Sequence, residues 1–160
     1  MLRPYPGFLR KHKGRFILGR KCQALLDDGG LRVIYPSLFE TYVRTFNWEY
    51  RDGIQELPFL QSSFTYSLFL LQKFGGEWLP DRFYSDQFAK ALPIVFDDVE
   101  ERYHSSGEDE LQCIYSVRVL RRFAGFMGLA RVESVRREGP GVDYRVKAPP
   151  LLDDIVRFNL

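Results

Sequence analysis

The stretch that decides the fold is YSVRVLRRFAGFMGLARVESVRREGPGVDYRVKAPPLL, residues 115–152. Its apolar residues first recur at helical spacing, which predicts a long helix from Glu108 to Met127 that ends at Gly128. Two alternating segments follow, 129–136 and 142–147, and the Gly/Pro-rich residues between them predict the turn of a β-hairpin. A last short helix is expected in 149–158.

Residues 108–158, in which a long helix leads through a glycine into a hairpin, resemble the C-terminal part of the winged-helix superfamily. In that superfamily a recognition helix is followed directly by a β-hairpin called the wing. The resemblance implies that the long helix and the hairpin form a nucleic-acid-binding surface. The whole sequence also resembles bacterial proteins of unknown role, and this second resemblance implies no site residue.

Upstream of this stretch, Gly and Pro separate the predicted elements. They are a hairpin in 8–18 and helices in 21–28, 37–51, 59–74, 81–92 and 94–103. The helix of 37–51 is expected to begin with a capping box made by Ser37 and Glu40. The predicted fold class is mainly α with a small β-hairpin wing, that is, a helical bundle plus a C-terminal winged-helix-like module. The expected domain segments are a basic hairpin with a short helix in 1–30, a helical core in 31–104 and the winged-helix-like module in 105–160.

The two ends of the chain share a pattern. Residues 8–28 (FLRKHKGRFILGRKCQALLDD) and 135–154 (VRREGPGVDYRVKAPPLLDD) each combine a basic hairpin with a short helix that ends in Leu-Leu-Asp-Asp. One hypothesis is that the N-terminal segment is the wing of a second, degenerate winged helix. Chance is an equal alternative, because short matches of this kind are common.

Length and composition indicate a folded protein of a reducing compartment. A chain of 160 residues with 45% hydrophobic residues buries enough surface to offset the loss of chain entropy. Cys22 and Cys113 have neither disulfide-framework nor metal-ligand spacing, and both are expected to be small core residues. The start of the chain lacks the pattern of a signal peptide, and no apolar run is long enough to cross a bilayer. The expected location is the cytoplasm, with no membrane partner.

Charge is distributed in three blocks. Residues 1–21 hold seven Lys or Arg and no acid, residues 97–110 hold seven acids and one Arg, and residues 113–147 hold eight Lys or Arg against three acids. This layout predicts separate charged surfaces, and the basic ones are candidates for binding a polyanion. For the N-terminal block, a solubilising loop tip is an equal alternative.

The candidate nucleic-acid-binding residues are basic. Arg118, Arg121 and Arg122 are expected on one face of the long helix, and none has an acid three or four positions away to pair with. The wing is expected to add Arg136, Arg137, Arg145 and Lys147 as phosphate contacts. The alternative is that the arginines pair with the acidic segment 97–110 and hold the fold together.

The sequence predicts no active site. His12 and His104 both fall in predicted loops, without a cysteine or carboxylate at ligand spacing. Each Asp-Asp doublet points its side chains about 100° apart on a helix, so no doublet makes a metal site alone. No catalytic residue, metal or cofactor is therefore expected, and the protein is expected not to be an enzyme.

These observations lead to two functional hypotheses. The first is a winged-helix protein that binds nucleic acid, with DNA as the expected partner and a regulatory role. The alternative is a non-enzymatic interaction subunit of a larger bacterial assembly, in which the winged helix is a scaffold and the partner is a protein. The acids that precede the long helix weigh against the first hypothesis, because they repel phosphates.

Overall fold

The computed structural model describes residues 8–50, 52–136 and 141–158. The chain divides into two compact units, residues 1–47 and 48–160. The expected segment boundaries after residues 30 and 104 thus fall inside the first and the second unit. Among the described helices, none is long and apolar enough to cross a membrane.

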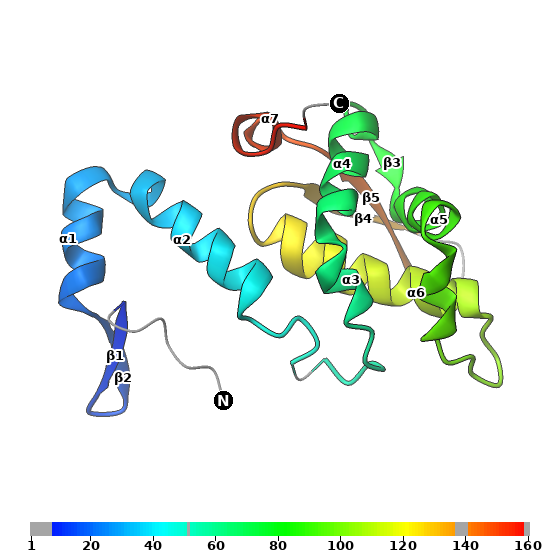
Figure 1. Cartoon of the computed structure of the whole chain (residues 1–160), viewed down its shortest axis with the longest axis horizontal. Coiled ribbons are helices and arrows are strands. Elements are labelled where there is room, and N and C mark those ends of the chain that lie inside the picture. The colour runs from blue at the N-terminus through cyan, green and yellow to red at the C-terminus, as the bar shows by residue number, and fades with distance from the viewer. Residues whose placement is uncertain (1–7, 51, 137–140, 159–160) are drawn as a thin grey trace. The chain divides into compact units, whose positions relative to one another are not determined.

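Unit 1 begins with the predicted hairpin, formed by β1 (Leu9–His12) and β2 (Arg15–Leu18). Its two-residue turn is Lys13-Gly14, with φ of +47° and +78°. Positive φ at both central residues is what a type I′ turn requires, and this turn matches the twist of the paired strands. In Figure 1 the hairpin extends away from the end of α1.

Two helices complete unit 1, α1 (Arg20–Gly29) and α2 (Leu31–Arg44). Phe8, Cys22 and Ile34 form their small core together with Leu25 and Leu26. The expected helix start at Ser37 is wrong: α2 begins six residues earlier and contains Pro36. Pro36 removes one backbone hydrogen bond from the helix, and the buried Ile34 lies in the part of α2 that precedes it.

Unit 2 starts with an irregular segment followed by α3 (Phe59–Ser62) and α4 (Phe64–Phe74). The sequence predicts a single helix here. It is interrupted because the hydroxyls of Ser62 and Ser63 both donate to the carbonyl of Phe59, at 3.0 and 2.5 Å, and compete with the helical amides. Leu68, Leu70 and Leu71 of α4 all lie in the core.

The next elements are β3 (Leu79–Pro80), α5 (Asp81–Ala91) and the 3₁₀ helix η1 (Pro93–Asp97). The helix expected in 94–103 does not extend beyond Asp97. Four acids lie within residues 97–101, and repulsion between like charges spaced three and four apart disfavours a helix there.

The long helix is present as predicted, but in two parts. α6 (Gly107–Tyr115) begins at Ser106, whose hydroxyl accepts the amide of Asp109 at 3.2 Å. It continues without interruption as a π-helix, η2 (Ser116–Gly125). In a π-helix each turn closes on the fifth residue, so its turns are wider than those of an α-helix.

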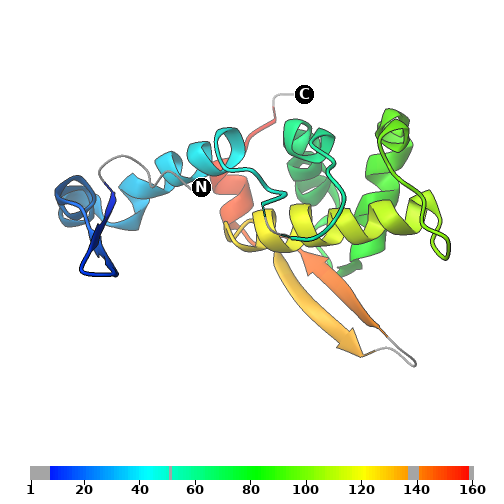
Figure 2. The ribbon, with the colours of Figure 1, turned by 90° about the horizontal axis from the view of Figure 1, so that it is seen from below.

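The second sheet has the strand order β3-β5-β4, where β4 is Arg131–Arg136 and β5 is Val142–Lys147. All pairs are antiparallel. The short helix α7 (Leu151–Ile155) follows. Figure 2 shows α4 and α5 on one side of the long helix and the β4–β5 hairpin extending from the other.

The core of unit 2 forms around η2. The ring of Trp48 stacks on Phe123, with centroids 4.4 Å apart, and Phe64 meets Phe123 edge-on at 5.7 Å. The chain is therefore mainly α with small antiparallel hairpins, as predicted. Cys22 is buried as expected, whereas Cys113 is exposed, so the expectation that it lies in the core is wrong.

Candidate interaction surface: the long helix and its hairpin

Arg118 is the most completely enclosed charged residue of η2, with 1% of its side chain exposed. Its Nε donates to Oδ2 of Asp52 at 2.7 Å, and its Nη2 donates to Oδ1 of the same carboxylate at 3.2 Å. Its Nη1 donates to Oε1 of Glu49 at 3.2 Å. Nη2 also reaches the carbonyl of Gln55 at 2.6 Å. The guanidinium is thus surrounded by acceptors.

The segment that carries these acceptors is fixed at both ends. Trp48 and Leu57 are buried, and the amide of Leu57 donates to the same Glu49 carboxylate that receives Arg118. Burial by itself raises the pKa of Asp52, but the hydrogen bond from Arg118, the amide of Ile54 and the charges of Arg118 and Arg122 outweigh it. The pKa of Asp52 is therefore held below its ordinary value of 3.8.

The prediction that Arg118 is a nucleic-acid contact is wrong, because a guanidinium that is 1% exposed and bound to two carboxylates cannot reach a phosphate. The alternative partner is wrong as well. Arg118 pairs with Glu49 and Asp52 rather than with the acidic segment 97–110. In that segment the described pairs are Arg82 with Asp109 at 3.1 Å and Arg102 with Glu110 at 3.5 Å.

Arg121 and Arg122 occupy different surroundings, because adjacent residues of a helix point in different directions. Nη1 of Arg121 donates to the hydroxyl of Tyr144 at 2.9 Å, and the guanidinium lies over that ring at 4.4 Å from its centroid. Arg121 therefore joins the helix to β5. Arg122 has 43% of its side chain exposed, and its Nη1 lies 3.6 Å from Asp52.

The basic residues of the β4–β5 hairpin that were predicted as phosphate contacts also have different surroundings. Arg145 binds Glu133 across the strands at 2.7 Å and lies over the ring of Trp78 at 4.9 Å. Lys147 lies 3.9 Å from Glu77. Arg136 is exposed at the end of β4. Arg137 lies outside the described residues.

A groove of about 880 Å³ runs between the N-terminal part of the long helix and the hairpin. One wall is β5, and the other is formed by α5, α6 and the loop before α6. Its lining residues are Trp78, Pro80, Asp81, Arg82, His104, Ser105, Asp109, Gln112, Val135, Asp143, Tyr144 and Arg145. The pairing of β3 with β5 stops at Pro80 and Arg145. On this side of β5, residues 142–144 therefore continue without a described strand beside them.

The charges of the groove are mixed. Three carboxylates, Asp81, Asp109 and Asp143, line it with two guanidiniums, Arg82 and Arg145. Asp81 is buried and accepts the hydroxyl of Ser116 at 2.5 Å. Asp109 accepts from Ser106 and Arg82, and these bonds lower its pKa. Three acids against two bases give no excess of positive charge to attract a polyanion.

Four residues position the arginines of this surface, although no pattern in the sequence marks them as candidates. They are Asp52, Glu49, Trp78 and Tyr144. Their partners lie 23 to 69 positions away in the sequence, so no local spacing could have found them. Of the two histidines, His104 lines the groove and His12 ends β1. Within the described part of the chain, no group of three His, Cys, Asp or Glu side chains could hold a metal ion.

Comparison of the chain with protein-family models, curated proteins and solved structures found no match. Any function proposed for the chain therefore depends on the geometry and charge of its own residues.

Proposed function

We propose that the chain acts by binding a protein partner, and that unit 2 is a winged helix used as a scaffold for this interaction. The winged-helix proposal is supported by the long helix, which leads through Gly128 directly into the β4–β5 hairpin, and by the third strand, β3, on the other edge of β5. The binding site we propose is the groove between the long helix and the hairpin.

The observation that carries this proposal is the charge of the groove. A nucleic acid needs an excess of cations, whereas this groove has more carboxylates than guanidiniums. Moreover, Arg82 is engaged by Asp109, and Arg145 by Glu133. A polypeptide offers both signs of charge as well as apolar side chains, and it fits a mixed surface that contains Trp78 and Val135.

The mode of binding follows from the sheet. Asp143 and Tyr144 of β5 line the groove beyond the two-residue strand β3. A partner segment in extended conformation can continue the line of β3 and take main-chain hydrogen bonds from this edge. The neighbouring side chains then select the sequence of the partner.

Two valines of the hairpin provide the test. Val135 lines the groove, whereas Val142 lies on the same hairpin outside the groove lining, and the two are 40% and 56% exposed. Val135→Arg places bulk and charge in the groove and should abolish co-purification of a stoichiometric partner from native cells. Val142→Arg adds the same charge outside the groove and should leave co-purification intact.

The same pair of variants separates protein from nucleic acid as the partner. An added arginine raises affinity for a polyanion wherever it lies near the contact, so Val135→Arg should weaken a protein complex but strengthen a DNA complex. Purification of a lone monomer from native cells, or equal recovery of partner with both variants, would refute the proposal.

Direct contact of unit 2 with DNA is the second candidate. The observation in its favour is the exposure of Arg131 and Arg136 along β4, where no described carboxylate forms an ion pair with either. If it is correct, Arg131→Gln with Arg136→Gln should weaken binding to mixed-sequence duplex and reduce its salt dependence.

The cytoplasmic location of the protein also stays a prediction.

A further inference from the structure

We infer that the β1–β2 hairpin of unit 1 is a separate binding site for duplex DNA, which enters the major groove and contacts phosphates on both sides. The hairpin and the first turn of α1 carry six cations: Arg10, Lys11, Lys13, Arg15, Arg20 and Lys21. All six are exposed. This site is distinct from the groove of unit 2 and does not depend on it.

Several other cations of the described chain have counter-charges, whereas these six have none among the described residues. Arg44, Arg82, Arg102, Arg145 and Lys147 each have a carboxylate within 4.0 Å. For the six cations of the hairpin region, no carboxylate among the described residues forms an ion pair. Their charge is therefore available for an external anion.

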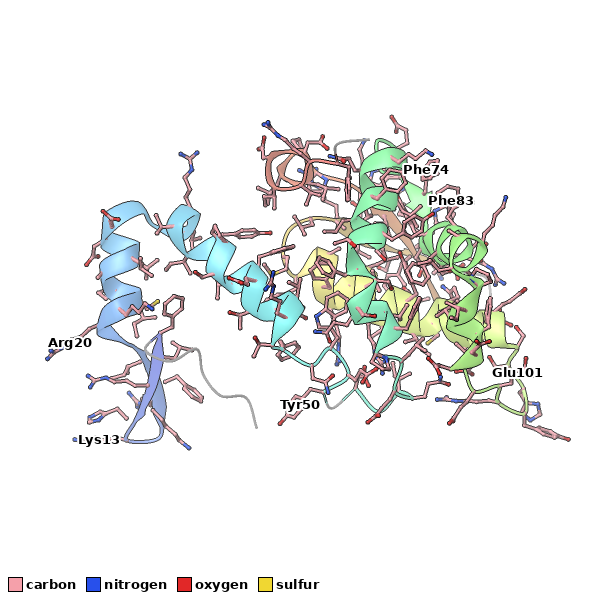
Figure 3. The ribbon with its side chains drawn as sticks, viewed as in Figure 1. Lys13, Arg20, Tyr50, Phe74, Phe83 and Glu101 are labelled. Atoms are coloured by element: carbon pink, nitrogen blue, oxygen red, sulfur yellow. The ribbon has the colours of Figure 1, made fainter. Side chains whose placement is uncertain are left out.

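The register of the strands distributes the cations around the hairpin. Arg10 pairs with Ile17 and His12 with Arg15, whereas Lys11 pairs with Phe16. Since side chains alternate between the faces of a strand, Arg10 and Arg15 lie on one face and Lys11 on the other. Lys13 occupies the turn at the tip (Figure 3), so the hairpin presents positive charge on both faces and at its end.

This distribution fits a groove better than a flat surface. An anionic membrane meets only one face of a ribbon, whereas the phosphates of a duplex groove flank both faces. The major groove of B-form DNA is about 12 Å wide and admits a two-stranded ribbon. A-form RNA has a deep and narrow major groove that does not. Phe16, which is 70% exposed beside Lys11, supplies an apolar contact for a thymine methyl group.

The hairpin is also held firmly enough to be a binding element. The amide of Gly19 donates to the carbonyl of Phe8 at 2.7 Å and closes the base of the hairpin. Phe8 is buried against the helices of unit 1. The cations therefore project from a fixed ribbon and lose less conformational freedom on binding than they would from a disordered tail.

The experiment uses the full chain and a fluorescent duplex of mixed sequence, about 20 base pairs long, with anisotropy measured from about 50 to 200 mM salt. The test variant is Arg10→Gln/Lys11→Gln/Lys13→Asn/Arg15→Gln. The matched control, Arg32→Gln/Lys73→Gln/Lys90→Gln/Arg157→Gln, removes the same charge from exposed cations without a described ion pair. A third variant, Lys11→Arg/Lys13→Arg, keeps the charge of the hairpin.

The test variant should bind at least about tenfold more weakly than the wild type at low salt. Its slope of log K against log salt should fall by about 0.9 for each phosphate that the hairpin no longer neutralises. The control should change less than about threefold, and the charge-keeping variant should bind like the wild type. Amide exchange of residues 9–18 checks that the hairpin of the test variant is folded.

Three results would overturn the inference. They are wild-type affinity in the test variant, an equal loss in the control, and binding of double-stranded RNA or of vesicles with about a third anionic lipid as tight as that of DNA. An equal loss in the control would show that the binding depends on the total positive charge of the chain and not on the β1–β2 hairpin. None of these results depends on the protein partner proposed for unit 2, which is tested by Val135→Arg.

Discussion

The guanidinium of Arg118 and the carboxylate of Asp52 form a two-point hydrogen-bonded pair in which both side chains are 1% exposed. The pair joins the π-helix η2 to the irregular segment that follows Trp48, 66 positions earlier in the chain. A buried pair of this kind contributes little net energy over an apolar pair, but it is costly to break. Arg118 is thus a structural residue of unit 2.

Removal of Asp52 should therefore destabilise unit 2 strongly. Asp52→Ala leaves Arg118 buried with Glu49 as its remaining carboxylate, and it should lower the free energy of unfolding by about 3 to 5 kcal/mol. Urea unfolding followed by Trp fluorescence measures the change. The control is Glu133→Gln, which breaks the half-exposed pair with Arg145 and should cost less than about 1 kcal/mol. Equal effects of the two variants would refute the structural role.

The same carboxylate predicts how stability depends on acid. The pKa of Asp52 is lower in the folded protein than its ordinary 3.8. The unfolded chain therefore binds the proton first, and stability is complete above about pH 4 and falls as the pH decreases through the folded pKa. Asp52→Asn has no proton to bind, so its unfolding free energy should decline less steeply between about pH 4 and pH 2. A slope equal to that of the wild type would contradict the assignment.

The buried hydroxyl of Tyr84 predicts how the stability of the protein depends on alkaline pH. Its hydroxyl is buried without a hydrogen-bond partner among the described residues. Burial raises the pKa of Tyr84 from 10.0 to about 12. The unfolded chain loses this proton first, so stability is complete below pH 10 and is lost as the pH rises toward 12.

Tyr84→Phe should remove this alkaline loss. Since no bond to the hydroxyl is broken, the variant should keep its stability at pH 7 to within about 1 kcal/mol. Thermal unfolding at about pH 7 and about pH 11 measures both effects. Tyr103→Phe, at a position that is 94% exposed, should change neither. A large destabilisation at neutral pH would show that the Tyr84 hydroxyl has a partner.

The turn of the basic hairpin predicts a stabilising substitution. Lys13 has a φ of +47°, a conformation that is unfavourable for most residues other than Gly but is tolerated by Asn. Lys13→Asn should stabilise the hairpin by up to about 1 kcal/mol and slow the amide exchange of residues 9–18. Lys11→Asn places the same residue type within β1 and should speed exchange instead.

Two adjacent glycines give a matched pair of substitutions. A Cβ on Gly75 would lie 2.6 Å from Cβ of Ala148, whereas a Cβ on Gly76 has no neighbour within 4 Å. The carbonyl of Gly75 also accepts the amide of Ala148 at 2.8 Å. Gly75→Ala should therefore lower the unfolding free energy by about 1 to 3 kcal/mol, and Gly76→Ala should be nearly neutral. Thermal denaturation of both variants is the measurement.

Gly75 also shows how a correct sequence prediction can rest on the wrong cause. The two glycines predict the end of α4 through a left-handed cap, and the helix does end at Phe74. The φ of Gly75 is −77°, however, so no left-handed conformation is involved. A Cβ at this position would clash with the carbonyl oxygen of Leu71 and would lie 2.6 Å from Cβ of Ala148, which follows β5. A pattern of neighbouring residues holds no information on the second of these approaches.

The elements whose causes are local could be predicted from the sequence alone. The hairpin of residues 9–18, the helix of 107–125 and the hairpin that follows it all come from periodicity and from glycine positions, which act over a few residues. The positive charge of the β1–β2 hairpin could also be predicted from nearby sequence, because residues 1–21 contain no acid to neutralise it.

The roles of the arginines, by contrast, depend on tertiary packing. Arg118, Arg121 and Arg122 look equivalent when placed at about 100° per residue, but in the folded structure Arg121 has a different partner from the carboxylate that Arg118 and Arg122 share. Arg118 meets Asp52, and Arg121 meets Tyr144. These partners come from distant segments brought together by the packing of Trp48 and Val146 in the core of unit 2. Contacts between distant segments therefore make Arg118 and Arg121, which were predicted to bind nucleic acid, into residues that hold unit 2 together.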